Sequence, residues 1–371
     1  MRKAIVTGSN GFVGRHVCEA LLKSNKYETI YGFDTLMSES ALPLEKWPNY
    51  TNPDAYKTLQ LYADDCRNLF TGKYFTSTYS DFSEFDVIHL AAVVGGRSTI
   101  EGSPLAVAED LSIDAMFFKW LQDLPAEKRP KNIVYFSSSA AYPIKYQTHD
   151  ELTRCTLREN MIDFTADNIG LADMSYGWSK LTGEYLAFLA KQKNGIDCIV
   201  FRPFSGYGED QHTAYPFPAI MKRVFDSAMA YASGDKSTPW QPTIDIWSDT
   251  VRDFIHIDDC VAIMMNALGL NGVEWKKTDS NYRVMNLGTG IDTSFSELAT
   301  KAIMIAAELF DLPLDKSAIK INILSNKPAG VQFRVSDTAY AEQTGMMIPL
   351  LTIEQGITKK LLNLALTHGV T

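Results

Sequence analysis

The chain has 371 residues, of which 46% are hydrophobic and 21% charged, and its formal net charge is −9. That length exceeds one ordinary domain and the composition is that of a folded protein, so extended disorder is excluded and two closely packed lobes are expected. The acidic balance argues against a nucleic-acid partner, and no apolar stretch approaches the length that crosses a membrane.

The start of the chain and its cysteines indicate a cytoplasmic protein. The N-terminus reaches glycine after an apolar run that is too brief for the core of a signal peptide. The five cysteines are scattered and form no CxxC pair, so neither a disulfide framework nor a thiolate zinc site is expected. The six histidines show no HExxH or paired spacing, and we expect no metal.

Short apolar runs alternate with helical patterns through the first half of the chain. The runs lack the alternation of polar and apolar residues that a half-exposed strand has, so both faces of each strand should be covered. This pattern predicts an α/β fold with a doubly wound parallel Rossmann sheet. The expected strands lie at 4–6, 29–33, 87–90, 133–136 and 198–201, and the expected helices at 12–23, 104–124 and 176–191.

The composition of the sequence changes after residue 203, where proline and aromatic residues become frequent. We predict that residues 1–203 form the Rossmann domain and that 204–371 form mainly a smaller C-terminal α/β lobe. Strand-like segments near 252–262 and 283–289 are expected to return to the first lobe.

A glycine triad follows the first expected strand and opens a helix, in the run TGSNGFVG at 7–14. Gly8 would turn the chain, Gly11 would let the backbone approach a pyrophosphate, and Gly14 would pack the helix on the strand. Asp34 ends the second strand, where a carboxylate accepts hydrogen bonds from ribose hydroxyls and repels a 2′-phosphate, which favours NAD over NADP. Arg15, just inside the helix, could instead meet such a phosphate, but we expect it on the solvated surface of the helix.

Tyr176 and Lys180 lie one helical turn apart, so their side chains share one helix face. An ammonium beside a phenol favours the phenolate and should lower the pKa of Tyr176 toward neutrality, which makes it a usable base. The segment SSSAAYP at 137–143 follows a buried strand, and ligands of open α/β sheets bind beyond the carboxyl ends of the strands. We expect these hydroxyls to face the same site.

Six motifs in order resemble the extended short-chain dehydrogenase/reductase superfamily, and within it the NAD-dependent nucleotide-sugar epimerase/dehydratase family. They are TGSNGFVG, HLAA at 89–92, SSS at 137–139, YGWSK at 176–180, RPFSGYG at 202–208 and RDFIHIDD at 252–259. The resemblance implies that the Rossmann domain binds NAD and that the second lobe closes over a nucleoside diphosphate sugar. It also implies a homodimer, built through the helices near 104–124 and 176–191.

The resemblance assigns roles to particular residues. Tyr176 takes a proton from a sugar hydroxyl while hydride passes to the nicotinamide, and Lys180 holds the nicotinamide ribose. Ser138 hydrogen-bonds the reacting oxygen, with Ser139 as the close competitor. The implied cofactor contacts are Gly8, Asn10, Gly11, Phe12, Val13, Gly14, Asp34, Asp65, Cys66, Leu90, Ala91, Ala92, Tyr176 and Lys180.

The substrate contacts that the resemblance implies are Arg97, Ser205, Arg252 and Arg334. Arg252 would grip the substrate diphosphate, because a guanidinium fork suits phosphate oxygens, and Arg334 would join it. Either arginine is also open to the simpler interpretation of a structural ion pair. Ser205 replaces an asparagine that is common in this family, so the contacts there are expected to differ.

The residue at position 140, an alanine, limits the types of reaction that the site can catalyse. The corresponding position resembles a glutamate in the 4,6-dehydratases, and a cysteine in GDP-mannose 3,5-epimerase and GDP-fucose synthase. A methyl group moves no proton. The sequence therefore favours an NAD-dependent nucleotide-sugar C4-epimerase or 4-oxidoreductase that acts through a 4-keto sugar.

Two alternatives stay open. The segment AAVVGG at 91–96 and the pair at 142–143 look closer to the GDP-sugar branch, so the nucleotide is either GDP or UDP. A GDP-sugar 3,5-epimerase/4-keto reductase would need another proton-transfer residue, for which Tyr215 or His212 is conceivable. A non-catalytic NAD-binding regulator is the third hypothesis, against which the intact Tyr176 and Lys180 speak.

Overall fold

The centre of the molecule is a seven-stranded sheet, in which every neighbouring pair is parallel and the strand order is β10-β6-β5-β4-β1-β2-β3. The computed structural model describes residues 2–37, 41–75, 81–93, 97–272, 275, 283–324, 330–348 and 350–369, with only the backbone of 97–99. The strands are β1 (Arg2–Thr7), β2 (Tyr27–Asp34), β3 (Leu59–Ala63), β4 (Phe85–His89), β5 (Asn132–Phe136), β6 (Cys198–Pro203) and β10 (Arg283–Leu287). This sheet confirms the predicted doubly wound Rossmann fold, and the five expected strands all belong to it.

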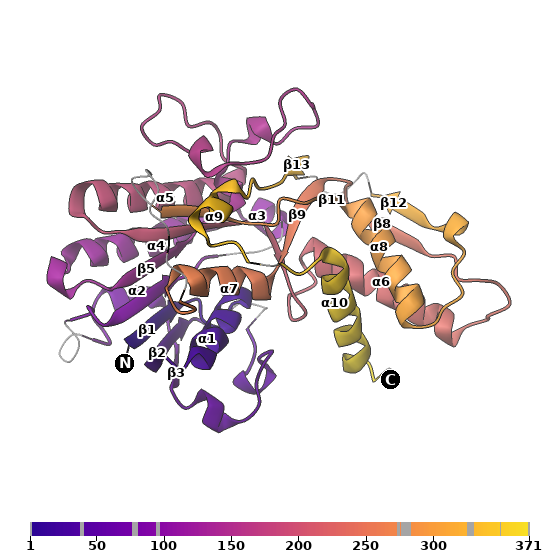
Figure 1. The fold of residues 1–371 in the computed structure, drawn as a ribbon, viewed down its shortest axis with the longest axis horizontal. Helices are drawn as coiled ribbons and strands as arrows, with labels where there is room; N and C mark the ends of the chain where they lie inside the picture. Colours follow the sequence, from indigo (N-terminus) through magenta and orange to yellow (C-terminus); the bar gives the residue numbers. More distant parts are fainter. Residues whose placement is uncertain are drawn as a thin grey trace.

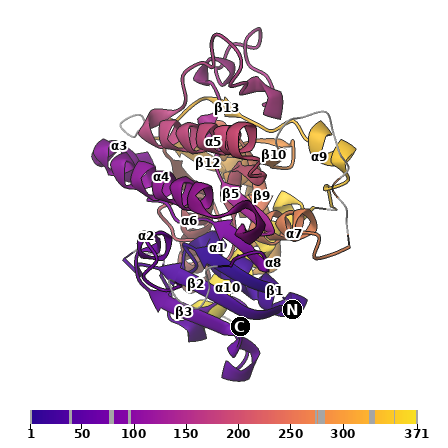
Figure 2. The same ribbon diagram turned by 90° about the vertical axis from the view of Figure 1, so that its left-hand side faces the viewer.

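Helices cover both faces of this sheet, which explains the continuous apolar runs in its strands. Alternate residues of one strand point to opposite faces: Ala4 and Val6 pack with α1 (Phe12–Ser24) and α7 (Ile257–Ala267), whereas Ile5 packs on the other side. That second side is covered by α2 (Cys66–Phe70), α4 (Val107–Asp123) and α5 (Met174–Asn194). Figures 1 and 2 show α4 and α5 lying side by side, with α3 (Arg97–Gly102) at the end of α4.

A second lobe lies beyond one end of the sheet, on the right in Figure 1. Its core is formed by α6 (Pro216–Ser233), α8 (Phe295–Leu309) and α10 (Ile353–Thr367), which pack around residues such as Phe225 and Ile303. Its short strands are β7 (Ser205–Tyr207), β8 (Thr243–Ile246), β9 (Val251–His256), β11 (Asp292–Ser294), β12 (Lys320–Ile323) and β13 (Phe333–Arg334). The helix α9 (Ala339–Thr344) lies against β10 of the large sheet.

The chain crosses between the two lobes more than once. Of the two segments expected to return, β10 joins the large sheet beside β6. By contrast, β9 lies in the middle of a four-stranded sheet with β7, β11 and β13, and only the helix that follows it, α7, packs on α1. The division at residue 203 stays a prediction.

Two further observations bear on the sequence-based expectations. The five cysteines are all free, and four of them are buried. Within the described ranges, no helix is both long and apolar enough to cross a membrane. A cytoplasmic location stays a prediction.

Candidate active site

The glycine-rich turn between β1 and α1 has the shape of a dinucleotide cradle. Gly8 has φ +69°, a left-handed conformation that favours glycine, and its N–H donates to the Phe33 carbonyl at 2.8 Å. A Cβ on Gly14 would lie 2.0 Å from the Gly8 carbonyl oxygen, so helix and turn meet only because this side chain is absent. The N–H of Gly11 donates back to the same oxygen at 3.1 Å, which closes the turn at the start of α1. Phe12 and Val13 follow directly as the first residues of that helix.

Asp34 stands at the end of β2, as expected from the sequence. Its carboxylate accepts the Asn10 N–H at 2.9 Å and the Leu36 N–H at 2.8 Å. It therefore fastens the glycine-rich turn, and each oxygen keeps a further lone pair for a ribose hydroxyl. These features fit the adenosine end of NAD.

Further residues of the expected cofactor set lie at the ends of neighbouring strands. The N–H groups of Leu90 and Ala91 both donate to the Thr7 hydroxyl at 3.2 Å, and Ala92 follows them. Asp65 caps α2 and pairs with Arg67 at 2.6 Å, and this ion pair lowers the pKa of Asp65. Cys66 is buried.

Tyr176, Lys180 and Ser138 come together where α5 passes the end of β5. Tyr176 hydrogen-bonds the Ser138 hydroxyl, and that hydroxyl also accepts the Ala140 N–H at 3.1 Å. The Lys180 ammonium is buried, 6.0 Å from the centre of the Tyr176 ring and 5.3 Å from that of Tyr135. A Cβ on Gly177 would lie 2.3 Å from the Ala140 carbonyl oxygen, so α5 and the serine-rich segment are in backbone contact beside the phenol.

The pKa of Tyr176 does not follow the sequence-based expectation. Burial raises this pKa well above the ordinary tyrosine value, and the charge of Asp110 raises it further, while the hydrogen bond with Ser138 lowers it. The lowering that we expected from Lys180 is therefore not achieved by the groups of the chain alone. Burial of the phenol is the main cause, and Asp110 and Asp114 of α4 add to it; sequence reasoning considered neither.

A cavity of about 380 Å³ opens in front of Tyr176, between the two lobes. Its lining includes Ser138, Ser139, Tyr176, Ser205, Arg252 and Arg334, six residues that were expected from the sequence. Ala140 also lines it, and contributes only a methyl group. Residues that sequence reasoning did not assign to the site are Ile100, Asp173, Thr213, Arg223 and Trp247.

Two arginines of this cavity are paired across neighbouring strands. Arg334 of β13 stands in register with Arg252 of β9, so their side chains leave the sheet on the same face. The Arg334 guanidinium donates to Gln147 and to the Asp173 carboxylate, each at 2.6 Å. Arg334 thus already has a carboxylate partner. Two guanidinium groups that leave the sheet on the same face of the cavity suit an anion with several oxygens, such as a diphosphate.

Arg97 and His212 are not among the described residues that line the cavity. Arg97 begins α3, but its side chain lies outside the described residues. His212 is exposed, its Nδ1 accepts the Ala214 N–H at 3.2 Å, and it lies outside the lining of the cavity. Tyr215, by contrast, lines the cavity, and burial together with the nearby Tyr176 raises its pKa to about 12.

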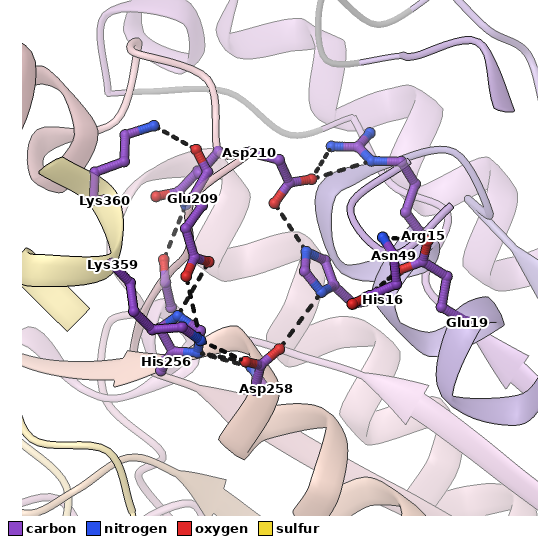
Figure 3. A network of polar contacts seen from close by, with 12 residues as sticks. Arg15, His16, Glu19, Asn49, Glu209, Asp210, His256, Asp258, Lys359 and Lys360 are labelled. Carbon is purple, nitrogen blue, oxygen red and sulfur yellow. Dashed lines mark hydrogen bonds and ion pairs between the residues drawn. The ribbon is translucent and has the colours of Figure 1, made fainter. Parts of the chain in front are cut away.

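Arg15 is not on a solvated helix surface, as we expected, but is fully buried. Its guanidinium donates to the Asp210 carboxylate at 2.7 Å and to the Asn10 carbonyl of the glycine-rich turn at 2.7 Å. Figure 3 shows that Asp210 also contacts His16, and that Lys359 of α10 reaches Glu209 and Asp258. We call this group the α1–α10 network; it consists of Arg15, His16, Glu209, Asp210, His256, Asp258, Lys359 and Lys360.

The fold and this site define a Rossmann enzyme that uses a nicotinamide dinucleotide. A family model described as the NAD dependent epimerase/dehydratase family matches residues 4–288. The chain belongs to this family and is an NAD-dependent enzyme, as predicted from the sequence.

Individual relatives agree with this membership. An uncharacterized UDP-glucose epimerase of Bacillus subtilis is 29% identical over 269 residues, which cover 72% of each chain. The UDP-glucuronate 4-epimerase of Thermodesulfobacterium geofontis is 23% identical and covers 96% of this chain and 94% of its own. The crystal structure of UDP-glucuronic acid 4-epimerase from Bacillus cereus, in complex with UDP-glucuronic acid and NAD, matches 98% of this chain and 99% of its own, with a TM-score of 0.69 and 20% identity.

Proposed function

We propose that this protein is a UDP-sugar C4-epimerase that works through a 4-keto sugar. One observation carries the proposal: a single cavity joins Tyr176 and Ser138 at its inner wall to the register pair of Arg252 and Arg334. A phenol and a hydroxyl suit an alcohol that is being oxidised, and paired guanidinium groups suit a diphosphate. The uridine part rests on the relatives from the three bacteria, which are UDP-sugar enzymes by name.

The residues of the chain account for the movement of the proton. Ser138 hydrogen-bonds the C4 oxygen of the sugar and the ionised Tyr176 oxygen takes the hydroxyl proton, while the C4–H bond breaks and its electron pair leaves as hydride. NAD, when bound, would supply the hydride acceptor and the later hydride donor, and its oxidised form would bring a positive charge to the cofactor site. After the ketone has turned, hydride returns to its other face and Tyr176 gives the proton back, so that C4 is inverted and no net oxidation occurs.

The two arginines allow this turn. Because Arg252 and Arg334 would hold the diphosphate, the sugar stays in the cavity when its own hydroxyls lose their contacts. The protein therefore anchors the part of the substrate that does not react, and leaves the reacting ring free to present either face.

Ala140 determines what the site does not do. A methyl group in the cavity wall neither takes nor gives a proton, so the hydrogens at the other ring carbons should remain in place. The C4 hydrogen itself is carried as hydride and returned, without exchange with water.

The test is conversion in heavy water. UDP-glucuronate, UDP-glucose and UDP-N-acetylglucosamine are incubated one at a time with the protein and NAD, and the products are analysed by NMR and mass spectrometry. We expect the C4 epimer of at least one of them, with no deuterium in the ring. Absence of turnover with every UDP sugar, or deuterium at a ring carbon, would contradict the proposal.

Replacement of the phenol should abolish this conversion. Tyr176→Phe is expected to lower kcat by about 10² to 10⁴, the usual contribution of a positioned acid or base. The matched control is Tyr185→Phe, because Tyr185 lies on the same helix but is 43% exposed. Full turnover in the Tyr176 variant would remove the basis of the proposed function.

One observation favours a second candidate, a GDP-sugar 3,5-epimerase/4-keto reductase. The Tyr215 phenol lines the cavity close to Tyr176, and its pKa of about 12 keeps it protonated near neutral pH. Such a phenol can donate a proton but is a poor base. Deuterium incorporation at C3 or C5 from a GDP sugar, lost in Tyr215→Phe, would favour this candidate over C4 epimerisation.

We also propose a homodimer through α4 and α5. These helices pack on each other, and they carry large apolar side chains on their exposed side, including Leu111, Trp178 and Tyr185. Helix pairs of this kind are covered when a second copy packs on them. Sedimentation should give a dimer at micromolar concentration, and Trp178→Glu should give a monomer; a monomer in both cases would contradict the proposal.

A further inference from the structure

A cluster of buried charges on α4 and α5 acts on Tyr176, and its members are not among the residues that line the cavity. Asp110 and Asp114 stand one turn apart on α4 and are each 2% exposed, and Lys180 of α5 is 3% exposed. The positive charge of Lys180 acts on both carboxyls. We call these residues, with His89, the α4–α5 cluster. Burying an unpaired carboxylate costs folding free energy, so the presence of two buried carboxyls beside the reacting phenol suggests that they have a function.

Asp114 is held by neighbours that fix it in place. Its oxygens accept the Tyr135 hydroxyl at 2.6 Å and contact the His89 ring at 3.2 Å, and the other His89 nitrogen contacts the Thr7 hydroxyl at 2.8 Å. These hydrogen bonds, together with Lys180, keep the pKa of Asp114 below its usual range despite its burial. A Cβ on Gly183 would lie 2.7 Å from the Asp114 carboxylate, so α5 packs tightly against it.

Asp110 makes a different set of contacts. It accepts the backbone N–H of Val93, which comes directly after the cofactor-lining residues Ala91 and Ala92, and it receives a longer contact of 3.4 Å from the Ser179 hydroxyl on α5. The carboxyl therefore joins the segment after β4 to the helix that carries Tyr176. Burial raises the pKa of Asp110, which is opposite to the direction for Asp114.

We propose that Asp110 is a positioning residue for the reaction: its carboxylate fastens the cofactor-lining segment after β4 to α5 and opposes negative charge on the Tyr176 oxygen. This inference rests on the proposed function, in which Tyr176 is the base. Burial and the charge of Asp110 both disfavour the phenolate. A positive charge in the cofactor site would act in the opposite direction and favour the ionised form of Tyr176.

The other groups around Tyr176 do not replace this effect. Lys180 comes from α5 and Tyr135 from β5, Ser138 precedes a short helical turn at 139–141, and Tyr215 lies at the start of α6. Burial lowers the pKa of His89. Asp173, one turn before Tyr176, is paired with Arg334. Among these groups, Asp110 exerts the largest charge effect on the phenol, and the effect of Asp114 in the same direction is smaller.

The experiment removes one negative charge at a time and keeps the side-chain shape. Asp110→Asn, Asp114→Asn and, as the matched control, Asp123→Asn are compared in the holoenzyme. Asp123 lies on the same helix, where its 59% exposed carboxylate pairs with Lys119. The readouts are the acid limb of the kcat/KM profile against pH, and the phenolate absorbance of each protein minus that of its Tyr176→Phe version.

We expect the acid limb and the phenolate transition to move toward lower pH by about one pH unit in Asp110→Asn, because a buried like charge has been removed. Asp114→Asn should move both in the same direction by less, and Asp123→Asn should move neither. Unchanged curves in Asp110→Asn overturn the inference. Should that variant fail to fold, unchanged curves in Asp114→Asn overturn it instead.

The outcome distinguishes the inference from the function on which it rests. If Tyr176→Phe abolishes turnover while Asp110→Asn leaves both curves in place, the inference fails and the proposed function stands. If Tyr176→Phe retains turnover, the proposed function fails first, but the absorbance difference still reports whether Asp110 acts on the phenol.

Discussion

The α4–α5 cluster and the α1–α10 network differ in how their carboxylates are buried and paired. Asp110 and Asp114 are each 2% exposed, whereas the side chains of the network carboxylates are 14% (Asp210), 23% (Glu209) and 52% (Asp258) exposed. In the α1–α10 network each carboxylate has a cation or a histidine at short range: Asp210 has Arg15 at 2.7 Å and His16 at 2.9 Å, and Asp258 has Lys359 at 2.9 Å. In the α4–α5 cluster, Asp110 and Asp114 both lie in the field of Lys180.

Asp110 differs from Asp114, and from the shifted carboxyls of the α1–α10 network, in the direction of its pKa shift. Ion pairs lower the pKa of Asp210 and bring that of Glu209 to about 2, so these carboxyls remain charged under all ordinary conditions. Asp110 shifts in the opposite direction, because its burial is not fully compensated. The first arrangement holds elements together, whereas the second leaves a charge imbalance beside the reacting phenol. Substitutions and a change of pH can test this distinction.

The largest effect is expected from Arg15→Met. This change removes the guanidinium partner of Asp210, whose side chain is 14% exposed, and releases the Asn10 carbonyl. Breaking such a largely buried pair costs about 3–5 kcal/mol. Urea unfolding should show the loss, together with weaker NAD binding. An unfolding free energy within about 0.5 kcal/mol of the parent would mean that the network does not hold the lobes together.

Acid should act on the α1–α10 network next. The pKa of Glu209 and that of Asp210 are lower in the folded chain than in the unfolded chain, where they lie near 4. Their stabilising effect is therefore complete above about pH 4 and is lost as the pH falls toward 2, and for Glu209 it amounts to about 2 kcal/mol after allowance for solvent screening. Urea midpoints measured across this range should fall, and the fall should be shallower in Glu209→Gln.

Arg252→Met tests a third arrangement of charge, the arginine pair of the cavity. Because Arg252 lines the cavity beside Arg334, its loss should raise KM for the UDP sugar about tenfold and change the unfolding free energy little, the reverse of Arg15→Met. Steady-state kinetics and urea unfolding of both variants check this contrast. An unchanged KM would mean that Arg252 does not bind the diphosphate and would favour the alternative interpretation, a structural ion pair.

The smallest effect is expected at an exposed pair. Lys119 and Asp123 lie four residues apart on α4 with side chains that are 66% and 59% exposed, and such pairs contribute about 0.5 kcal/mol or less. Lys119→Met should therefore leave the unfolding free energy within about that amount. A loss comparable to that of Arg15→Met would mean that burial is not what separates the two classes of pair.

Most strands of the large sheet and many residues of the candidate site could be predicted from the sequence. Strands covered on both faces show as continuous apolar runs, which is why β1, β2, β4, β5 and β6 were predicted. The edge strand β3 was missed, because its residues are mostly exposed and its pattern is weak. The motifs located Tyr176, Ser138 and Arg252, and Arg334 was predicted separately to join Arg252; the structure brings all four to one cavity.

Charge partners distant in the chain were beyond sequence reasoning. Arg15 looked like a surface residue because Asp210, its partner, is 195 positions away. The effect of Lys180 on Tyr176 was predicted from their spacing alone, without the carboxyls of α4 that act in the opposite direction. A signal for these was present: Asp110 and Asp114 lie at helical spacing among the apolar residues Ile113, Phe117 and Phe118, on the face that should be buried.

The two glycines of α5 have a consequence for how the reacting groups are aligned. At Gly177 the helix meets the backbone of Ala140, and at Gly183 it meets the Tyr135 ring and Asp114, so at both points the helix has no side chain that could act as a spacer. Main-chain contact is stiffer than contact between side chains, which can change rotamer. The packing of α5 therefore fixes the distance between the Tyr176 phenol and Ser138 before any sugar binds. Substrate binding then does not have to rearrange these two side chains.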